Sequence, residues 1–298
     1  MVLNYHLEGN LRNYLQKNHS NSTLKDRITM FHRIYGRLYD IHHEDLIHCD
    51  LHSGNIIMQG GGCFITDLGL CGPVDNELSN KIYGIISYIA PEVLRGNKHH
   101  TKESDVYSIG MLMWEIFSGY PPFNDRAHDC YLILEICKND LRPPILSNMP
   151  KEYVEMMKKC WDVDPSKRPT IGELWNFAED YSNNLYKNEP LNNKIITHIT
   201  SNLNNKNKTI RKFTNFSRKF YKASNNKKLV ITANDSNSSY SNNNNNNNDQ
   251  IQKPHPLAYH SSRILENDIV KYKSLQQSLE LGPVSEVISE MEVEGKLN

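Results

Sequence analysis

The sequence predicts a mainly helical α+β domain over residues 1–185, followed by a polar tail. Apolar residues recur every three or four positions between Thr23 and His42, which is typical of an amphipathic helix. Two short apolar runs, 56–58 and 63–65, flank three consecutive glycines, a pattern that predicts a β-hairpin. Beyond about residue 187, Asn and Ser replace most large apolar side chains, so this part cannot bury enough surface to fold.

The helices of the domain can be assigned in order. The long helix over 23–42 has Ser22 or Thr23 as its N-cap. The run 106–117 is apolar on nearly every face, so we expect a buried helix there, with Ser104 as its N-cap. Further helices are predicted over 10–16, 149–161 and 171–181.

Composition divides the chain into three parts. They are the domain over 1–185, an Asn-rich and partly basic disordered linker over 186–253, and a tail over 254–298. In the tail we expect short helices around 255–273 and 284–293. The basic stretch 206–228 is interpreted as a solvated linker, so nucleic acid is not an expected partner.

The charge balance and the cysteine spacing indicate the cellular environment of the protein. Lys and Arg together number 34, as do Asp and Glu, so the formal net charge is zero. The six cysteines show neither C-x-x-C pairs nor the spacing of zinc ligands, which favours reduced thiols in an intracellular protein. No apolar run is long enough to cross a bilayer, and no signal peptide precedes the domain. We therefore expect no membrane span and a cytoplasmic location.

Three motifs within about 45 residues carry the chemistry: His48-Cys49-Asp50-Leu51-His52-Ser53-Gly54-Asn55, Thr66-Asp67-Leu68-Gly69 and Ala90-Pro91-Glu92. Phosphoryl transfer needs a carboxylate that accepts the substrate hydroxyl proton, and Asp50 has that position. It also needs oxygen ligands for Mg²⁺, for which Asn55 and Asp67 have the spacing. The predicted hairpin lies between these two residues, so both can reach the same metal.

These motifs resemble those of the eukaryotic protein kinase family. His48-Cys49-Asp50 is similar to its H-R-D, Asp67-Leu68-Gly69 to its D-F-G, and Ala90-Pro91-Glu92 is its A-P-E unchanged. The resemblance continues in Ser104–Gly110, Pro121-Pro122-Phe123, Cys160–Pro165 and Arg168-Pro169. The Cys-Trp and Arg-Pro pairs resemble the tyrosine-kinase-like group, whose members mostly phosphorylate Ser and Thr. The resemblance covers residues 1 to about 180 and implies a kinase-like C-terminal lobe with a small β-hairpin at the active site.

The resemblance also assigns the site. It implies ATP and Mg²⁺ as cofactors and a protein substrate or signalling partner. The implied catalytic residues are Asp50, Asn55 and His52, the cofactor-binding residues are Asn4, His6, Ile57 and Asp67, and the metal ligands are Asn55 and Asp67.

Two structural contacts are implied as well. Asp105 is expected to accept hydrogen bonds from backbone amides of the catalytic loop. Glu92 and Arg168 are expected to form a buried ion pair between the activation segment and the end of the lobe.

The sequence departs from the kinase pattern in several places. It begins at what resembles the hinge between the lobes, and it contains neither G-x-G-x-x-G nor V-A-I-K. These belong to the N-terminal lobe, so we expect a truncated domain in which this chain alone is weak or inactive. Cys49, His52 and Ile85 stand where the family usually has Arg, Lys and Thr.

Two other functions stay open. The departures favour a non-catalytic, pseudokinase-like interaction protein in signalling. The pattern His-x-Asp-Leu-His-x-Gly-Asn also resembles the catalytic loop of small-molecule phosphotransferases. Those enzymes lack the A-P-E segment, the Ser-Asp-Val-Tyr-Ser helix start and the terminal Arg-Pro, all of which are present here.

Overall fold

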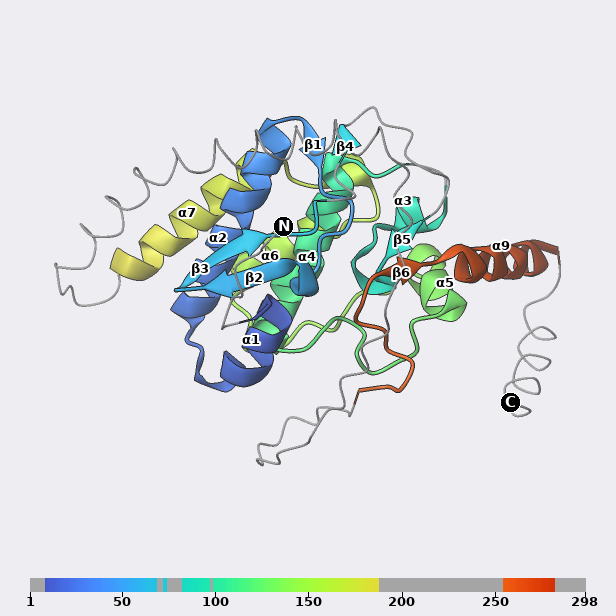
Figure 1. Cartoon of the computed structure of the whole chain (residues 1–298), viewed down its shortest axis with the longest axis horizontal. Helices are drawn as coiled ribbons and strands as arrows, with labels where there is room; N and C mark the ends of the chain where they lie inside the picture. The colour runs from blue at the N-terminus through green and yellow to red at the C-terminus, as the bar shows by residue number, and fades with distance from the viewer. Residues whose placement is uncertain (1–8, 69–71, 74–81, 97–98, 188–253, 282–298) are drawn as a thin grey trace, which may run out of the picture. The chain divides into compact units, whose positions relative to one another are not determined.

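The computed structural model describes residues 9–68, 72–73, 82–96, 99–187 and 254–281, and Figure 1 labels its elements. In chain order they are α1 (Leu11–Asn18), α2 (Leu24–His43), β1 (Leu46–Ile47), β2 (Ile56–Gln59), β3 (Gly62–Ile65), β4 (Gly72–Pro73), β5 (Tyr83–Gly84), α3 (Pro91–Leu94), α4 (Lys102–Ser118), α5 (Cys130–Lys138), α6 (Lys151–Cys160), α7 (Ile171–Lys187), β6 (Arg263–Ile264) and α9 (Glu266–Leu281). The strands pair antiparallel as β1 with β4, β2 with β3, and β5 with β6. The described parts of 9–187 and 255–281 belong to one compact unit, so the mainly helical fold with small sheets is confirmed.

Helix α4 is the centre of the core. Every residue from Ser104 to Phe117 is buried, which confirms the buried helix. Ser104 is not the N-cap, however: Thr101 is, and its hydroxyl accepts a hydrogen bond from the Ser104 amide while the Ser104 hydroxyl accepts one from the Thr101 amide. This capping box adds a polar first turn, with Glu103 exposed, that the apolar pattern does not reveal.

Helices α2 and α7 lie side by side at one edge of the domain (Figure 1). Thr23, one of the two predicted N-caps, caps α2, and it forms a capping box with Asp26. The glycine at position 36 allows close packing, because a methyl group there would lie 3.0 Å from a ring carbon of Trp175 on α7. On its other side α2 buries the apolar stripe predicted from the sequence, including Phe31 and Leu38.

The predicted hairpin is confirmed as β2 and β3. Ile56 pairs with Ile65, and Gln59 with Gly62. Gly60 and Gly61 form the turn with φ of 53° and 72°, a region that favours glycine. The Thr66 amide donates to the Asn55 carbonyl (2.8 Å), which continues the pairing beyond the strands.

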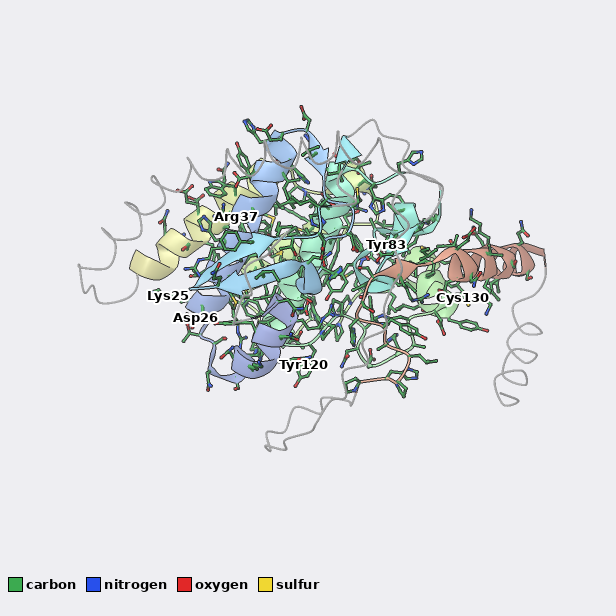
Figure 2. All side chains as sticks on the ribbon, viewed as in Figure 1. Lys25, Asp26, Arg37, Tyr83, Tyr120 and Cys130 are labelled. Atoms are coloured by element: carbon green, nitrogen blue, oxygen red, sulfur yellow. The ribbon has the colours of Figure 1, made fainter. Side chains whose placement is uncertain are left out.

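The tail is partly helical, but α9 covers only the second half of the predicted range 255–273. Residues 254–265 contain no helix; the segment includes β6, and α9 begins only at Glu266. The buried residues Leu265, Ile269 and Tyr272 pack into the core, with α9 lying against α5 (Figure 1). Figure 2 labels Tyr83 on β5, the strand that pairs with β6. It also labels Cys130 at the start of α5, the helix that contacts α9.

Some predictions fall on other parts of the chain. Asn4, His6 and the predicted helix over 284–293 lie outside the described residues, as does the linker apart from 186–187 at the end of α7. Within the described ranges, no helix is both long and apolar enough to span a membrane.

Candidate active site

The loop from His48 to Asn55 takes its shape from Asp105 on α4. The amides of His48 and Cys49 donate to the two Asp105 carboxylate oxygens at 2.8 and 3.1 Å, which confirms the predicted contact. His42 Nε2 lies 2.9 Å from the same carboxylate. Burial alone would raise the pKa of Asp105, but these partners hold it below its usual value. The charged carboxylate can therefore hold Cys49 at φ 70°, a strained backbone conformation for a residue other than glycine.

His48 links the loop to the end of β3. Its Nε2 lies 2.9 Å from the Thr66 carbonyl, and its Nδ1 lies 3.3 Å from the Asp50 amide. Because a carbonyl only accepts and an amide only donates, the proton is on Nε2. Burial lowers the pKa of His48 and so favours this neutral form. The side chain fixes the position of Thr66, the residue before Asp67, relative to Asp50.

Asp50 is largely buried at the centre of the site. The Asn55 side-chain amide donates to the Asp50 carbonyl (2.9 Å) and lies 3.3 Å from Oδ2 of its carboxylate. Burial raises the pKa of Asp50, but His52 and the Ser262 hydroxyl stabilise the charged form and keep the pKa below its usual value. Asp50 is therefore an anion at neutral pH, the charge state that its predicted role requires.

His52 presents a defined nitrogen to the site. Its Nδ1 accepts the Gly54 amide proton at 3.0 Å, so in the neutral ring the proton is on Nε2. Nε2 lies 3.7 Å from Asp50 Oδ2. A side chain at Gly54 would place its Cβ 2.8–2.9 Å from the imidazole. The tight turn after His52 thus requires glycine and aims the ring at Asp50.

The predicted Mg²⁺ ligands lie at the same end of the hairpin. Thr66 donates to the Asn55 carbonyl through both its amide (2.8 Å) and its hydroxyl (3.1 Å), which holds Asn55 beside the strand end that carries Asp67. Asp67 is exposed and has φ 58°. Amide and carboxylate oxygens suit Mg²⁺, which keeps several waters and needs only one or two protein ligands beside substrate phosphates. The donor set therefore fits the ion. Ile57 lies half-buried on β2 next to Asn55.

The activation segment is anchored to the lobe by the predicted ion pair. Arg168 donates to both Glu92 carboxylate oxygens at 2.7 and 2.8 Å. The same guanidinium donates to the carbonyls of Glu103 (3.0 Å) and Asp162 (2.9 Å). Since these contacts satisfy the buried charges, the ion pair is a rigid attachment point, and the prediction is confirmed.

A second anchor was missed by the sequence reasoning. The Tyr88 hydroxyl donates to Oε2 of the buried Glu115 at 2.6 Å, and the Ser108 hydroxyl donates to the Tyr88 carbonyl at 2.8 Å. Burial raises the pKa of Glu115. The signal was visible: Glu115 is the one charged residue in the apolar run 106–117.

Comparison with known proteins identifies the class. Residues 1–177 match the protein tyrosine and serine/threonine kinase family, so the chain belongs to this family. It is 32% identical over 139 residues to mitogen-activated protein kinase kinase kinase 7 of Bos taurus and of Homo sapiens, covering 46% of this chain. It is 31% identical over 141 residues, 47% of the chain, to a probable serine/threonine-protein kinase of Dictyostelium discoideum. The matches span 24%, 23% and 10% of these three relatives, so the chain matches a quarter or less of their length.

Proposed function

We propose that this protein transfers the γ-phosphoryl group of ATP to Ser and Thr hydroxyls of protein substrates, and that the 298-residue chain alone is weak or inactive because it contains neither G-x-G-x-x-G nor V-A-I-K. The observation that carries the proposal is an ionised, buried Asp50 whose two carboxylate oxygens lie 2.9 and 2.8 Å from a serine hydroxyl, that of Ser262. This is the geometry required of a group that accepts a substrate hydroxyl proton. Kinase family membership supports the same chemistry.

Each site residue has a role in this proposal. Asp50 accepts the hydroxyl proton and orients its oxygen, and His52 Nε2–H donates to that oxygen. Asn55 and Asp67 would hold Mg²⁺, which when bound neutralises charge on the phosphates. Asn4, His6 and Ile57 would contact the nucleotide. Because the buried side chains of Asp50, His52 and Asn55 are held by hydrogen bonds, little reorganisation is needed at the moment of transfer.

The surroundings of Asp50 favour a polypeptide substrate over a small molecule. Strand β5, which precedes the A-P-E segment, pairs with an extended strand, β6, directly beside Asp50. Backbone pairing of this kind recognises an extended peptide irrespective of most of its side chains. Cys160-Trp161 and Arg168-Pro169 further support a tyrosine-kinase-like enzyme that modifies Ser and Thr. Use of ATP is consistent with a cytoplasmic location.

A second candidate is a non-catalytic interaction protein. The features that favour it are Cys49, His52 and Ile85, which replace residues usual in active kinases. Asp50, Asn55 and Asp67 are all retained, and for that reason we place catalysis first.

The test is phosphoryl transfer by the native protein, captured from its source cells through the C-terminal tail, beside the 298-residue chain alone. Each is incubated with γ-labelled ATP, Mg²⁺, a mixture of dephosphorylated proteins and a set of small hydroxyl compounds. The proposal predicts label on phosphoserine and phosphothreonine that disappears when Mg²⁺ is chelated. Label only on a small hydroxyl compound, or stable partner binding without any transfer by the native protein, would contradict it.

A further inference from the structure

Segment 255–265 lies across the candidate site, with a turn at 255–258 followed by a stretch that includes the strand β6. Ile264 pairs with Tyr83 and Arg263 with Gly84 in the antiparallel β5–β6 ladder, and the Leu265 amide donates to the Ile82 carbonyl at 2.9 Å. Residues 82–84 precede the A-P-E segment. The tail therefore pairs with a strand that adjoins Asp50, since a methyl group at Gly84 would lie 3.1 Å from Asp50 Oδ1.

The contacts continue along the segment on both sides of its centre. The His255 amide donates to the Asn124 carbonyl and the His128 amide to the Leu257 carbonyl, both at 2.9 Å. The Arg12 guanidinium donates to the His260 carbonyl. On the other side Leu265, which is 0% exposed, enters the core ahead of α9. The segment is thus held at several points and passes Asp50 in one register.

That register brings Ser262 to the catalytic residues. Its hydroxyl oxygen lies 2.9 and 2.8 Å from the two Asp50 carboxylate oxygens and 2.8 Å from His52 Nε2. Because His52 Nδ1 accepts the Gly54 amide proton, Nε2–H is the donor to the serine oxygen. The Ser262 proton is then directed at Asp50, and a lone pair of the oxygen is left for bond formation. The backbone is also fixed here, since the Tyr83 hydroxyl donates to the Ser262 carbonyl at 3.2 Å.

We propose that Ser262 is a phosphoacceptor that this site modifies within its own chain, an inference that rests on the proposed kinase function. The Ser262 oxygen forms a bond to the γ-phosphorus of a nucleoside triphosphate while the bond from that phosphorus to the β,γ-bridging oxygen breaks. The hydroxyl proton passes to the Asp50 carboxylate, and the nucleoside diphosphate leaves with the bridging oxygen. Ser262 ends as a phosphate monoester.

Phosphoserine at position 262 is not accommodated beside Asp50 as the unmodified serine is. A phosphoserine carries close to two negative charges at pH 7 and would stand against the Asp50 carboxylate. The guanidinium of the neighbouring Arg263 is already paired with Asp268 (2.7 Å) and donates to the His128 carbonyl (2.8 Å). Modification of Ser262 therefore drives segment 255–265 away from Asp50 and opens the site to other protein substrates.

The experiment maps label on the native protein after incubation with γ-labelled ATP and Mg²⁺, with an added dephosphorylated protein present. Ser262→Ala is compared with Ser261→Ala, a matched control at the adjacent, exposed serine. We expect Ser262→Ala to lower label in the tail at least tenfold and Ser261→Ala to leave it unchanged. The labelled fraction per unit time should not depend on protein concentration, because the acceptor is in the same chain.

The outcomes separate the two proposals. Label on the added protein with none on Ser262 would overturn the self-modification and leave the proposed kinase function standing. No label on either protein would overturn both. Label on Ser262 whose rate rises in proportion to protein concentration would overturn transfer within one chain.

A second measurement does not depend on activity. Hydrogen exchange of the Leu265 amide reports whether the segment is docked, because this amide is bonded to the Ile82 carbonyl. Ser262→Glu is compared with Ser262→Gln, which has nearly the same size without the charge. We expect exchange at least tenfold faster in the Glu variant. Equal protection in the two variants would overturn the release of the segment on phosphorylation.

Discussion

The catalytic loop and segment 255–265 meet at Asp50 but are encoded in opposite ways. The loop is eight residues of recognisable spacing that end at Asn55, and its partner Asp105 follows from the same family pattern. The segment has no motif, and its central residue Ser262 is 212 positions from Asp50 along the chain. The comparison shows that the residues of the proposed chemistry can be identified from a short stretch of sequence. The segment that lies against them can be identified only from the folded structure.

The largest expected stability effect concerns the lobe that carries the loop. Arg168→Ala leaves the Glu92 carboxylate buried without its partner, which should lower the free energy of unfolding by about 3–5 kcal/mol. Urea denaturation measures the change, and Lys167→Ala, at an exposed neighbour, is the control. A loss below about 1 kcal/mol would mean that the ion pair does not anchor the activation segment.

The next effect concerns docking of the tail. Leu265 is fully buried, so Leu265→Ala should weaken docking of the segment by about 2–5 kcal/mol, the range for such truncations in a core. Protease cleavage between 255 and 281 measures docking, with Ile264→Ala at the 54% exposed neighbour as the control. Equal cleavage of both variants would show that Leu265 is not the anchor.

The smallest expected effect is a pH dependence of docking. Burial, with the positive charge of Arg12 and the neighbouring His128, lowers the pKa of His260 to about 3. In the released segment that pKa returns to about 6.5, so docking is at full strength above pH 6.5 and weakens as pH falls below it. One pH unit below 6.5 the cost is about 1.4 kcal/mol, a roughly tenfold larger released fraction.

Hydrogen exchange of the Leu265 amide at pH 7.5 and 5.5, corrected for its intrinsic pH dependence, measures this change. The change in released fraction between the two pH values should be smaller in His260→Gln, because glutamine does not titrate. Part of the pH dependence should remain in that variant, since burial also lowers the pKa of His128. A released fraction that is equal at the two pH values would contradict the role of His260 in the pH dependence of docking.

Much of the lobe could be predicted because its signals are local. The hairpin follows from two apolar runs around glycines, and the cap of α2 from Thr23 three residues before Asp26. The Glu92–Arg168 pair was predicted by resemblance and is confirmed. The proposed nucleotide contacts of Asn4 and His6 stay predictions, since both lie outside the described residues.

The misses have physical reasons. The start of α4 was placed too late because its first turn is polar and is specified by the capping box at Thr101. Helix α5 was not predicted, although Asp129 caps it and the buried Leu132, Ile133 and Ile136 follow a helical spacing. The strand β6 in segment 255–265 has no local signal at all. It depends on pairing with Tyr83 and Gly84, which lie about 180 positions earlier in the chain.

The measurement that tests the account most directly is phosphoryl transfer by the native protein carrying Asp50→Asn. The variant keeps the size of the side chain but loses the anion that accepts the hydroxyl proton. Asp180→Asn, at an exposed position on α7, is the matched control. We predict a rate at least about 10²-fold lower for Asp50→Asn and an unchanged rate for the control. Equal transfer by Asp50→Asn and the unsubstituted protein would contradict the assignment of Asp50 as the centre of the site.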